Sequence, residues 1–288
     1  MLDWFSARGR AFPFRGTTDP YLVLVSETLL QQTQISRGGP AWVRFTSEFP
    51  TVEALAAATP AAVLRAWRGL GYNRRAINLQ RAARIVVTEL GGAFPRDVAG
   101  LERLPGIGPY TARAVASIAY RIPTGAVDTN VRRVLGRVLA GDPAALGPAR
   151  LQAAADRIVD PVRPDEWTHA LMDIGSTLCR PVGPLCPECP VAAFCAYATG
   201  KRPGRAPTRR SPGSRAASGG FQATTRWLRG RILDRLRAAP GDAWLTFDES
   251  IGDHDPPAVG RSLAALARDG LLELDDRGPN PRARLPIA

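Results

Sequence analysis

The sequence predicts a mainly helical protein with a small C-terminal domain that resembles a winged helix. Three observations predict this fold class. Apolar residues recur at helical spacing through residues 1–198, a stretch with almost no large apolar side chain follows at 199–220, and periodic patterns return at 221–288. The length of 288 residues is that of one to two domains.

Four runs carry the helical pattern of the first part, and proline and glycine residues separate them. They are PYLVLVSETLLQQTQ, VEALAAATPAAVLRAW, AINLQRAARIVVTEL and PYTARAVASIAY. We expect a helix from each run, because apolar residues three and four positions apart share one helix face. No run before residue 199 alternates in the way that predicts a strand.

Residues 199–220 hold mainly Gly, Pro, Ser and Arg, which indicates a flexible basic linker, either lying on a phosphate backbone or simply solvated. TRWLRGRILDRLRAA then predicts a basic amphipathic helix. PPAVGRSLAALARDG predicts a second helix, with Pro257 near its start and Gly270 as its stop. LLELDD and RARLPIA predict two strands joined across a Gly-Pro-Asn turn, so 221–288 is interpreted as a winged-helix module.

The charge of the chain indicates a polyanionic partner. The chain has 38 Lys and Arg against 26 Asp and Glu, for a net charge of +12, and its one lysine is Lys201. A strongly basic, arginine-rich protein usually binds nucleic acid. A general preference for arginine explains the choice of basic residue but not the surplus over acids. No apolar run is long enough to span a membrane, and we expect a monomer in the cytoplasm, associated with the nucleoid.

All four cysteines fall within seventeen residues, spaced C-x6-C-x2-C-x5-C: Cys179, Cys186, Cys189 and Cys195. Two disulfides suit a small secreted scaffold, but this chain is long and does not start like a secretory leader. A zinc site usually has two short C-x2-C pairs, and only one is present here. The spacing therefore favours an iron–sulfur cluster over zinc, with zinc left open.

The run LERLPGIGPYTARAVASIAY predicts a helix, a tight turn and a second helix. Gly106 and Gly108 allow left-handed backbone and close approach of a ligand, and Pro109 opens the second helix. Exposed amides at such a turn suit a DNA phosphate. An ordinary helix–helix turn is the alternative.

Two carboxylates are candidates for catalysis. Glu27 follows an apolar run, where burial would raise its pKa and suit it to general-acid work, unless it lies on a wet helix face. Asp128 precedes a helix in VDTNVRRVL, so it also suits a simple N-cap. Its value as a catalytic group depends on Glu27 lying nearby.

Further polar groups suit contact with DNA. Gln31, Gln32 and Thr33 follow Glu27 and suit base edges or a wedge into the duplex. Tyr72 lies on a Gly-flanked turn beside Arg74 and Arg75, which combines an aromatic ring for stacking with charge for phosphates. Arg132 lies on the helix after Asp128.

Five stretches and the cysteine set carry a resemblance to a known family. The stretches are SETLLQQTQ, FPTVEALAAA, AWRGLGYNRRAINL, LPGIGPYTARAV and VDTNVRRVL. Taken together, these features resemble the helix-hairpin-helix DNA glycosylases that carry an iron–sulfur cluster. Within that superfamily the chain looks most like the MutY adenine DNA glycosylases. The resemblance covers about residues 4–198. It implies two helical subdomains with the active site between them, and a [4Fe–4S] cluster held by the four cysteines.

The resemblance also implies roles for single residues. Glu27 matches the acid that protonates adenine and later activates water, and Asp128 the carboxylate that stabilises the cationic sugar. Tyr110 matches an active-site tyrosine, and Asn130 a residue that hydrogen-bonds near the catalytic carboxylate. Residues that match those probing the opposite strand are Gln32, Thr33, Leu70 and Tyr72.

The expected function is monofunctional excision of adenine opposite 8-oxoguanine or guanine in double-stranded DNA. Related lyases attack the sugar with a lysine, whereas Tyr110 occupies that position here and residues 1–200 contain no lysine.

MutY proteins usually end in a MutT-like domain, which this tail is too short to form. A thymine/uracil mismatch glycosylase therefore stays open as an alternative, and a non-catalytic or redox-sensing iron–sulfur protein is the alternative of another class.

Overall fold

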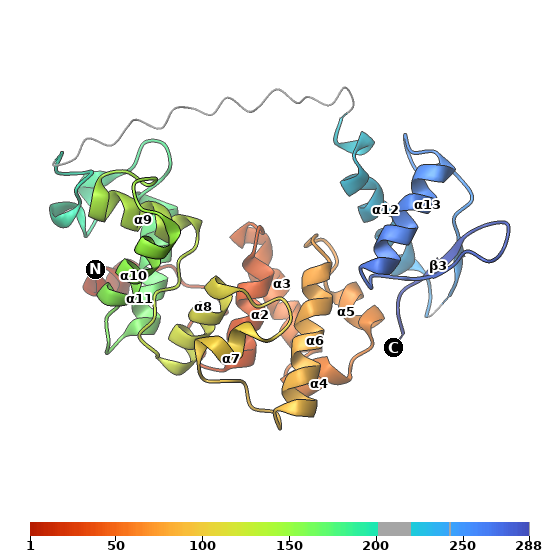
Figure 1. The fold of residues 1–288 in the computed structure, drawn as a ribbon, viewed down its shortest axis with the longest axis horizontal. Helices are drawn as coiled ribbons and strands as arrows, with labels where there is room; N and C mark the ends of the chain where they lie inside the picture. Colours follow the sequence, from red (N-terminus) through yellow and green to blue (C-terminus); the bar gives the residue numbers. More distant parts are fainter. Residues whose placement is uncertain (201–219, 242, 288) are drawn as a thin grey trace. The chain divides into compact units, whose positions relative to one another are not determined.

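The computed structural model describes residues 1–200, 220–241 and 243–287, and these are mainly helical, as predicted (Figure 1). The helices are α1 (Leu2–Arg8), α2 (Pro20–Leu30), α3 (Ile35–Glu48), α4 (Val52–Ala57), α5 (Pro60–Ala66), α6 (Arg74–Glu89), α7 (Val98–Glu102), α8 (Pro109–Tyr120), α9 (Thr129–Ala140), α10 (Pro148–Ile158), α11 (Pro164–Asp173), α12 (Thr225–Ala238) and α13 (Pro256–Arg268). The strands are β1 (Leu245–Thr246), β2 (Glu273–Asp275) and β3 (Arg282–Arg284).

The chain divides into two compact units. The first contains Met1–Glu27 and the chain from Phe94 to residue 200, and the second contains Thr28–Ala93 and the described residues from 220 onward. The predicted linker at 199–220 lies outside the described residues except at its ends. The predicted division into domains at 1–198 and 221–288 stays a prediction.

The first unit is built around the helices that follow residue 94. Helix α8 packs against α7 and α11, and α9 packs against α10 and α11. A buried apolar cluster joins α9, α10 and α11, and it includes Val134, Leu151 and Leu171. This core extends toward the cysteine loop, because Cys179 and Cys189 pack against it.

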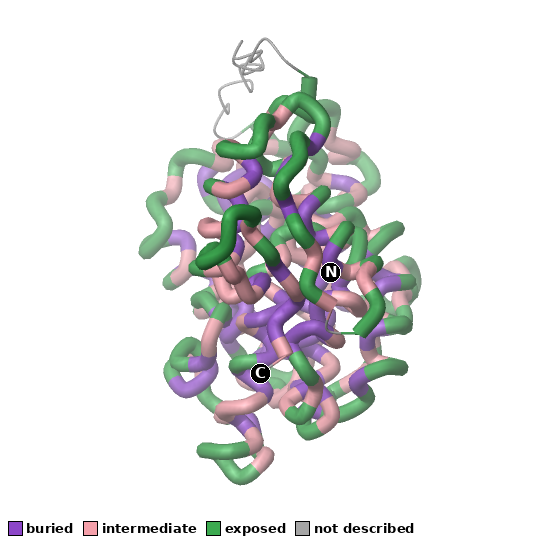
Figure 2. The backbone as a smooth tube through the Cα atoms, turned by 90° about the vertical axis from the view of Figure 1, so that its right-hand side faces the viewer, coloured by how far each residue is buried: buried purple, intermediate pink, exposed green. Residues whose placement is uncertain are grey.

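The helices of the second unit pack around α6, which contacts α4 and α5. Trp67, which ends α5, is fully buried and makes an edge contact with Phe45 at 5.7 Å between ring centroids. Figure 2 shows the resulting alternation of buried and exposed positions along the helices.

The C-terminal part of the second unit has the order helix, strand, helix, hairpin. Helices α12 and α13 pack on each other, and α13 packs on β2. The sheet has the order β1-β3-β2 and is antiparallel, with Leu274 paired to Ala283. The predicted helices and hairpin are confirmed. Strand β1 was not predicted, because a strand of two residues is too short to show alternation.

Two predicted helices were too long. Helix α2 ends at Leu30, because Gln32 adopts a left-handed backbone with φ 53° that no helix can continue. The run at 52–67 forms two helices, because Thr59 precedes proline and takes an extended conformation with ψ 147°. The side chain of Thr59 then caps α5 through the N–H of Ala62.

None of the helices in the described part of the chain combines the length and the apolar character that a membrane span requires.

Candidate functional site

The carboxylate of Glu27 lies inside the protein, near the end of α2. Glu27 is 7% exposed, and its neighbours Leu24 and Val25 are almost fully buried. Asp19 starts the helix, because its carboxylate accepts a hydrogen bond from the N–H of Tyr21 at 2.8 Å. Burial raises the pKa of Glu27 to about 7. Glu27 therefore does not lie on a wet helix face.

Tyr110 meets Glu27 from the first turn of α8. Its hydroxyl donates a 2.7 Å hydrogen bond to Oε2 of Glu27. Against the larger effect of burial, this bond lowers the pKa of Glu27, whereas the charge of Asp128 raises it. Burial and the charge of Glu27 raise the pKa of Tyr110 well above its ordinary value. The phenol therefore keeps its proton at neutral pH and acts as a donor.

The turn between α7 and α8 places Tyr110. Gly106 has a φ of 80°, in the left-handed region that glycine adopts freely. Gly108 precedes the helix and Pro109 occupies its first position, where the missing N–H costs nothing. A Cβ added to Gly108 would meet nothing within 4 Å, so the turn is open to an approaching ligand. Phosphate binding at Gly106 and Gly108 stays a prediction.

Asp128 is the N-cap of α9, as the simpler interpretation of this residue predicted. Its Oδ1 accepts a hydrogen bond from the N–H of Val131 at 2.6 Å, and its Oδ2 accepts one from Nδ2 of Asn130 at 3.1 Å. The cap does not exclude catalysis, because it also fixes the direction of the carboxylate. Asp128 is near enough for its charge to raise the pKa of Glu27, so two carboxyls share one electrostatic environment.

Asn130 connects Asp128 to the cysteine loop. Its Oδ1 accepts a 2.8 Å hydrogen bond from Arg133, whose guanidinium also donates to the carbonyl oxygens of Cys179 and Gly175, each at 2.6 Å. Gly175 is required there, because an added Cβ would lie 2.7 Å from Cβ of Asn130. The sequence pattern indicated no role for Arg133, which simply follows Arg132. The contacts of Arg133 with Cys179 and Gly175 depend on a segment more than 40 positions away. Arg132 is half-buried on α9.

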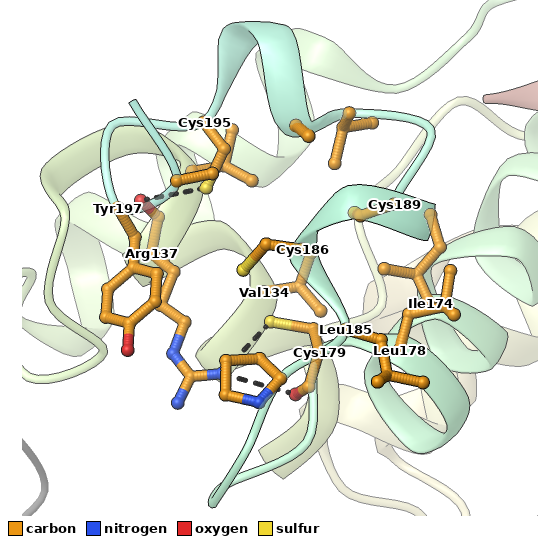
Figure 3. Close-up of a pocket in the computed structure, with 15 residues that line it drawn as sticks. Val134, Arg137, Ile174, Leu178, Cys179, Leu185, Cys186, Cys189, Cys195 and Tyr197 are labelled. Carbon is orange, nitrogen blue, oxygen red and sulfur yellow. Dashed lines mark hydrogen bonds between the residues drawn. The ribbon is translucent and has the colours of Figure 1, made fainter. Parts of the chain in front are cut away.

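The four cysteines are free thiols that line a single pocket (Figure 3). A π-helical turn, Ile174–Leu178, precedes Cys179, and apolar side chains such as Val134 complete the wall. Arg137 is 3% exposed, and its guanidinium lies 3.3 Å from Sγ of Cys179. The guanidinium also lies over the ring of Tyr197 at 4.9 Å.

The thiols suit a sulfur-liganded metal centre in donor type. The pocket lining contains four sulfurs and no carboxylate or imidazole, which is the ligand set of an iron–sulfur cluster. The cavity between the side chains is small, about 20 Å³. Within the described residues no three His, Cys, Asp or Glu side chains are grouped closely enough to hold a single metal ion. Four thiols match the donors of an iron–sulfur cluster and also those of a tetrathiolate zinc site, so the cluster itself stays a proposal.

A buried carboxylate that the sequence did not single out supports the first unit near the site. Asp173 is fully buried and accepts hydrogen bonds from the guanidinium groups of Arg10 and Arg15, at 2.6–2.9 Å. Burial would raise the pKa of Asp173, but the bonds from Arg15 and Arg10 hold it below its ordinary value. The charge of Arg15 also lowers the pKa of Glu27. No local pattern predicts the contacts of Asp173 with the two arginines, because the partners lie some 160 positions apart.

The side chains predicted to contact the opposite strand gather in two turns of the second unit. Residues 31–33 form the turn after α2, and residues 69–73 form the turn before α6. Two of the three non-glycine residues with left-handed backbone in the described chain are here, Gln32 at φ 53° and Tyr72 at φ 46°. Such strain is typical of functional turns. Tyr72 is 45% exposed and Arg74 is 68% exposed at its side chain, whereas Leu70 is half-buried.

Arg75 joins these two turns, and its predicted contact with phosphate stays a prediction. Its guanidinium donates to the carbonyl oxygens of Thr28 and Gln31, at 2.6 and 2.5 Å, and to that of Leu70 at 3.2 Å. Burial lowers the pKa of Arg75. The local sequence shows two adjacent arginines, and only the tertiary contacts separate their roles.

The chain is similar to known proteins of base excision DNA repair. A family model described as "HhH-GPD superfamily base excision DNA repair protein" matches residues 25–159. The chain is 38% identical to the adenine DNA glycosylase of Mycolicibacterium smegmatis over 278 residues, which cover 95% of this chain and 91% of that protein. It is 42% identical to the adenine DNA glycosylase of Homo sapiens, over 68% of this chain and 38% of that longer protein.

Solved structures show the same fold. A thermostable thymine-DNA glycosylase has a TM-score of 0.65 at 29% identity, covering 69% of this chain and 93% of that one. An endonuclease III in a non-covalent DNA complex has a TM-score of 0.58 at 23% identity, over 69% of this chain and 92% of that one.

Proposed function

Because the chain belongs to the HhH-GPD superfamily of base excision DNA repair proteins, we propose that it removes adenine mispaired with 8-oxoguanine or guanine in double-stranded DNA. It is a DNA N-glycosylase, which hydrolyses the bond between a base and its deoxyribose. The observation that carries the proposal is the buried Glu27, held by Tyr110 and with a pKa of about 7. A carboxyl with that pKa holds a proton near neutral pH and can still release it.

Glu27 supplies the proton in the proposed reaction. Adenine is a poor leaving group until one of its ring nitrogens is protonated, and the protonated carboxyl of Glu27 donates to it. Tyr110 orients the carboxyl, because its hydroxyl occupies one of the two oxygens of Glu27 and leaves the other for the base. After the base leaves, ionised Glu27 accepts a proton from the water that attacks the sugar.

Asp128 stabilises the positive charge that develops on the sugar as the glycosidic bond breaks. Its carboxylate is held in place by the N–H of Val131 and the amide of Asn130. One carboxyl must hold a proton while the other stays charged, and burial of Glu27 together with the charge of Asp128 favours that division.

We expect the reaction to end at base removal, because residues 1–200 contain no lysine to attack the sugar. The chain's one lysine is Lys201, outside the described residues, and Tyr110 is a hydroxyl that keeps its proton. Borohydride reduction during turnover should therefore trap no protein–DNA adduct. A high yield of trapped adduct would overturn the monofunctional assignment.

The four cysteines would hold a [4Fe–4S] cluster. When bound, the cluster would act as a structural crosslink within the loop of residues 179–195 and take no part in bond breaking. The guanidinium of Arg137 lies next to Sγ of Cys179, where its positive charge would stabilise anionic thiolates. Iron and sulfide analysis of protein purified without oxygen should give about four of each per chain. Zinc in their place would show that the ligand set was assigned to the wrong metal.

A single-turnover panel tests the substrate. Duplexes that carry A:8-oxoG, A:G, T:G and U:G are incubated with excess enzyme, and the abasic product is cleaved with alkali. Excision from A:8-oxoG and A:G is expected. Excision from T:G or U:G alone would favour the thymine/uracil alternative, for which the similarity to a thymine-DNA glycosylase structure is the supporting observation. Binding without excision from any duplex would indicate a non-catalytic protein.

A further inference from the structure

The second unit has a large groove outside the catalytic residues described above. It encloses about 1050 Å³ and lies between the two turns that carry Gln32 and Tyr72 on one side and helix α12 on the other. Its lining contains seven arginines and one aspartate: Arg37, Arg74, Arg75, Arg226, Arg229, Arg231, Arg237 and Asp234. A groove with this surplus of positive charge suits a polyanion.

Hydrogen bonds hold helix α12 against α5 and against the turn before α6. The side chain of Arg237 is 5% exposed and donates to the carbonyl oxygen of Leu64 at 2.8 Å and to Oδ1 of Asn73 at 2.7 Å. The carbonyl oxygen of Gly241, after the helix, accepts a 2.5 Å bond from Arg65. Hydrogen bonds within this unit therefore fix the shape of the groove. One wall comes from the turns that carry Gln32 and Tyr72, and the other comes from α12.

Most of the arginines in the groove are already engaged. Arg229 and Arg74 pair with Asp269, and Arg231 and Arg237 pair with Asp234. Their charge is therefore partly neutralised in the free protein.

Arg226 differs from these arginines. It is exposed, and it forms no ion pair with any residue in the described part of the chain. Its guanidinium lies over the ring of Tyr72, 4.8 Å from the centroid. Such a contact is weak at an exposed site, roughly that of a surface ion pair, so a phosphate can displace it readily. The ring that this contact covers is the one proposed to stack on bases.

We propose that α12 forms the second wall of the DNA-binding groove, and that Arg226 binds a phosphate of the strand opposite the excised adenine. Tyr72 stacks among the bases of that strand when DNA enters, and Arg226 leaves the ring for the adjacent backbone. The inference rests on the proposed function for the identity of the strand. The C-terminal part of the second unit, which contains α12, would then contact DNA directly.

The test measures the dependence of DNA binding on salt. The protein of residues 1–288, carrying Asp128→Asn to prevent turnover, is titrated with an A:8-oxoG duplex by fluorescence anisotropy at several KCl concentrations. Each phosphate neutralised contributes about 0.9 to the slope of log K against log salt. Arg226→Met should make the slope shallower by about 0.9, whereas Arg226→Lys should keep it because the charge remains.

Arg261→Met is the matched control, because Arg261 is exposed on α13 and does not line the groove. It should leave the slope unchanged. Arg226→Gln repeats the neutral change if the Met variant unfolds early, as judged by circular dichroism. Ethylation interference then places the contact, and phosphates on the strand opposite adenine should lose their effect in Arg226→Met.

An unchanged slope in the neutral variants would overturn the inference, as would loss of interference on the adenine strand instead. These outcomes are separable from failure of the proposed function. Adenine excision by the wild-type protein with no effect of Arg226 on the slope removes the inference alone. An Arg226-dependent slope without excision of any base removes the proposed function and leaves α12 as a DNA-binding wall.

Discussion

The hydroxyl of Tyr110 donates a 2.7 Å hydrogen bond to Oε2 of Glu27, across 83 positions of the sequence. Burial raises the pKa of both groups, and the bond between them lowers that of Glu27 and raises that of Tyr110. The two groups are therefore coupled: the phenol of Tyr110 stays protonated, and its hydrogen bond limits how far burial raises the pKa of Glu27.

Replacing Tyr110 with Phe should move the pH profile of adenine excision to higher pH. The hydrogen bond from Tyr110 stabilises ionised Glu27, so its loss raises the pKa of Glu27 further above the value of about 7. Activity that needs protonated Glu27 falls as pH rises through that pKa, and the falling limb should shift upward by roughly one unit. Single-turnover rates from about pH 5 to pH 9 measure the limb. A shift to lower pH would contradict this account of the pair.

Replacing Glu27 with Gln should abolish excision and stabilise the fold at high pH. In the wild type, the pKa of Glu27 rises from its ordinary value of 4.5 to about 7 on folding, because burial disfavours the charge. Stability that is fully present below pH 4.5 is therefore lost as pH rises through about 7, at a cost of the order of 3 kcal/mol. Gln cannot ionise, so this loss should disappear.

Thermal unfolding of the Glu27→Gln variant and the wild type at acidic and at mildly alkaline pH checks the sign. The variant's advantage should be larger under alkaline conditions. An equal difference at both pH values would show that Glu27 does not ionise with a raised pKa.

Two substitutions of Asp128 should separate its two roles. Asn can accept the same bond from the N–H of Val131, so Asp128→Asn should keep the N-cap, whereas Asp128→Ala should cost about 1 kcal/mol of stability. Both should lose excision by a factor of roughly 10²–10³, because neither stabilises a cationic sugar. Chemical denaturation and single-turnover rates on the same samples test this. Full activity in the Asn variant would assign Asp128 to capping alone.

Replacing Gly175 with Ala should lower activity through Asn130. The added Cβ would lie 2.7 Å from Cβ of Asn130, so α9 or the segment before Cys179 must shift. Overpacking of this kind costs roughly 1–3 kcal/mol. The control is Gly147→Ala, where a Cβ meets nothing within 4 Å. Equal stability and excision rates in the two variants would show that this contact does not position the site.

Several features of this protein could be predicted from sequence because they are local. Helical spacing predicted the helices, and the order of periodic runs at 221–288 predicted two helices and a hairpin. The turn at Gly106 and Gly108 and the cap at Asp128 depend on neighbours within a few positions. Helix ends were less accurate, because the left-handed backbone at Gln32 depends on the fold around it.

The sequence by itself determined the class of protein, the four thiols and the two carboxylates, because residue type and spacing carry that information. Tertiary structure alone decided that Tyr110 bonds Glu27, that Arg133 joins Asn130 to the loop of Cys179, and that Arg226 covers Tyr72. Each of these contacts joins side chains brought together by the packing of different elements. A pKa or a charge pairing depends on distance and burial, which no local pattern specifies.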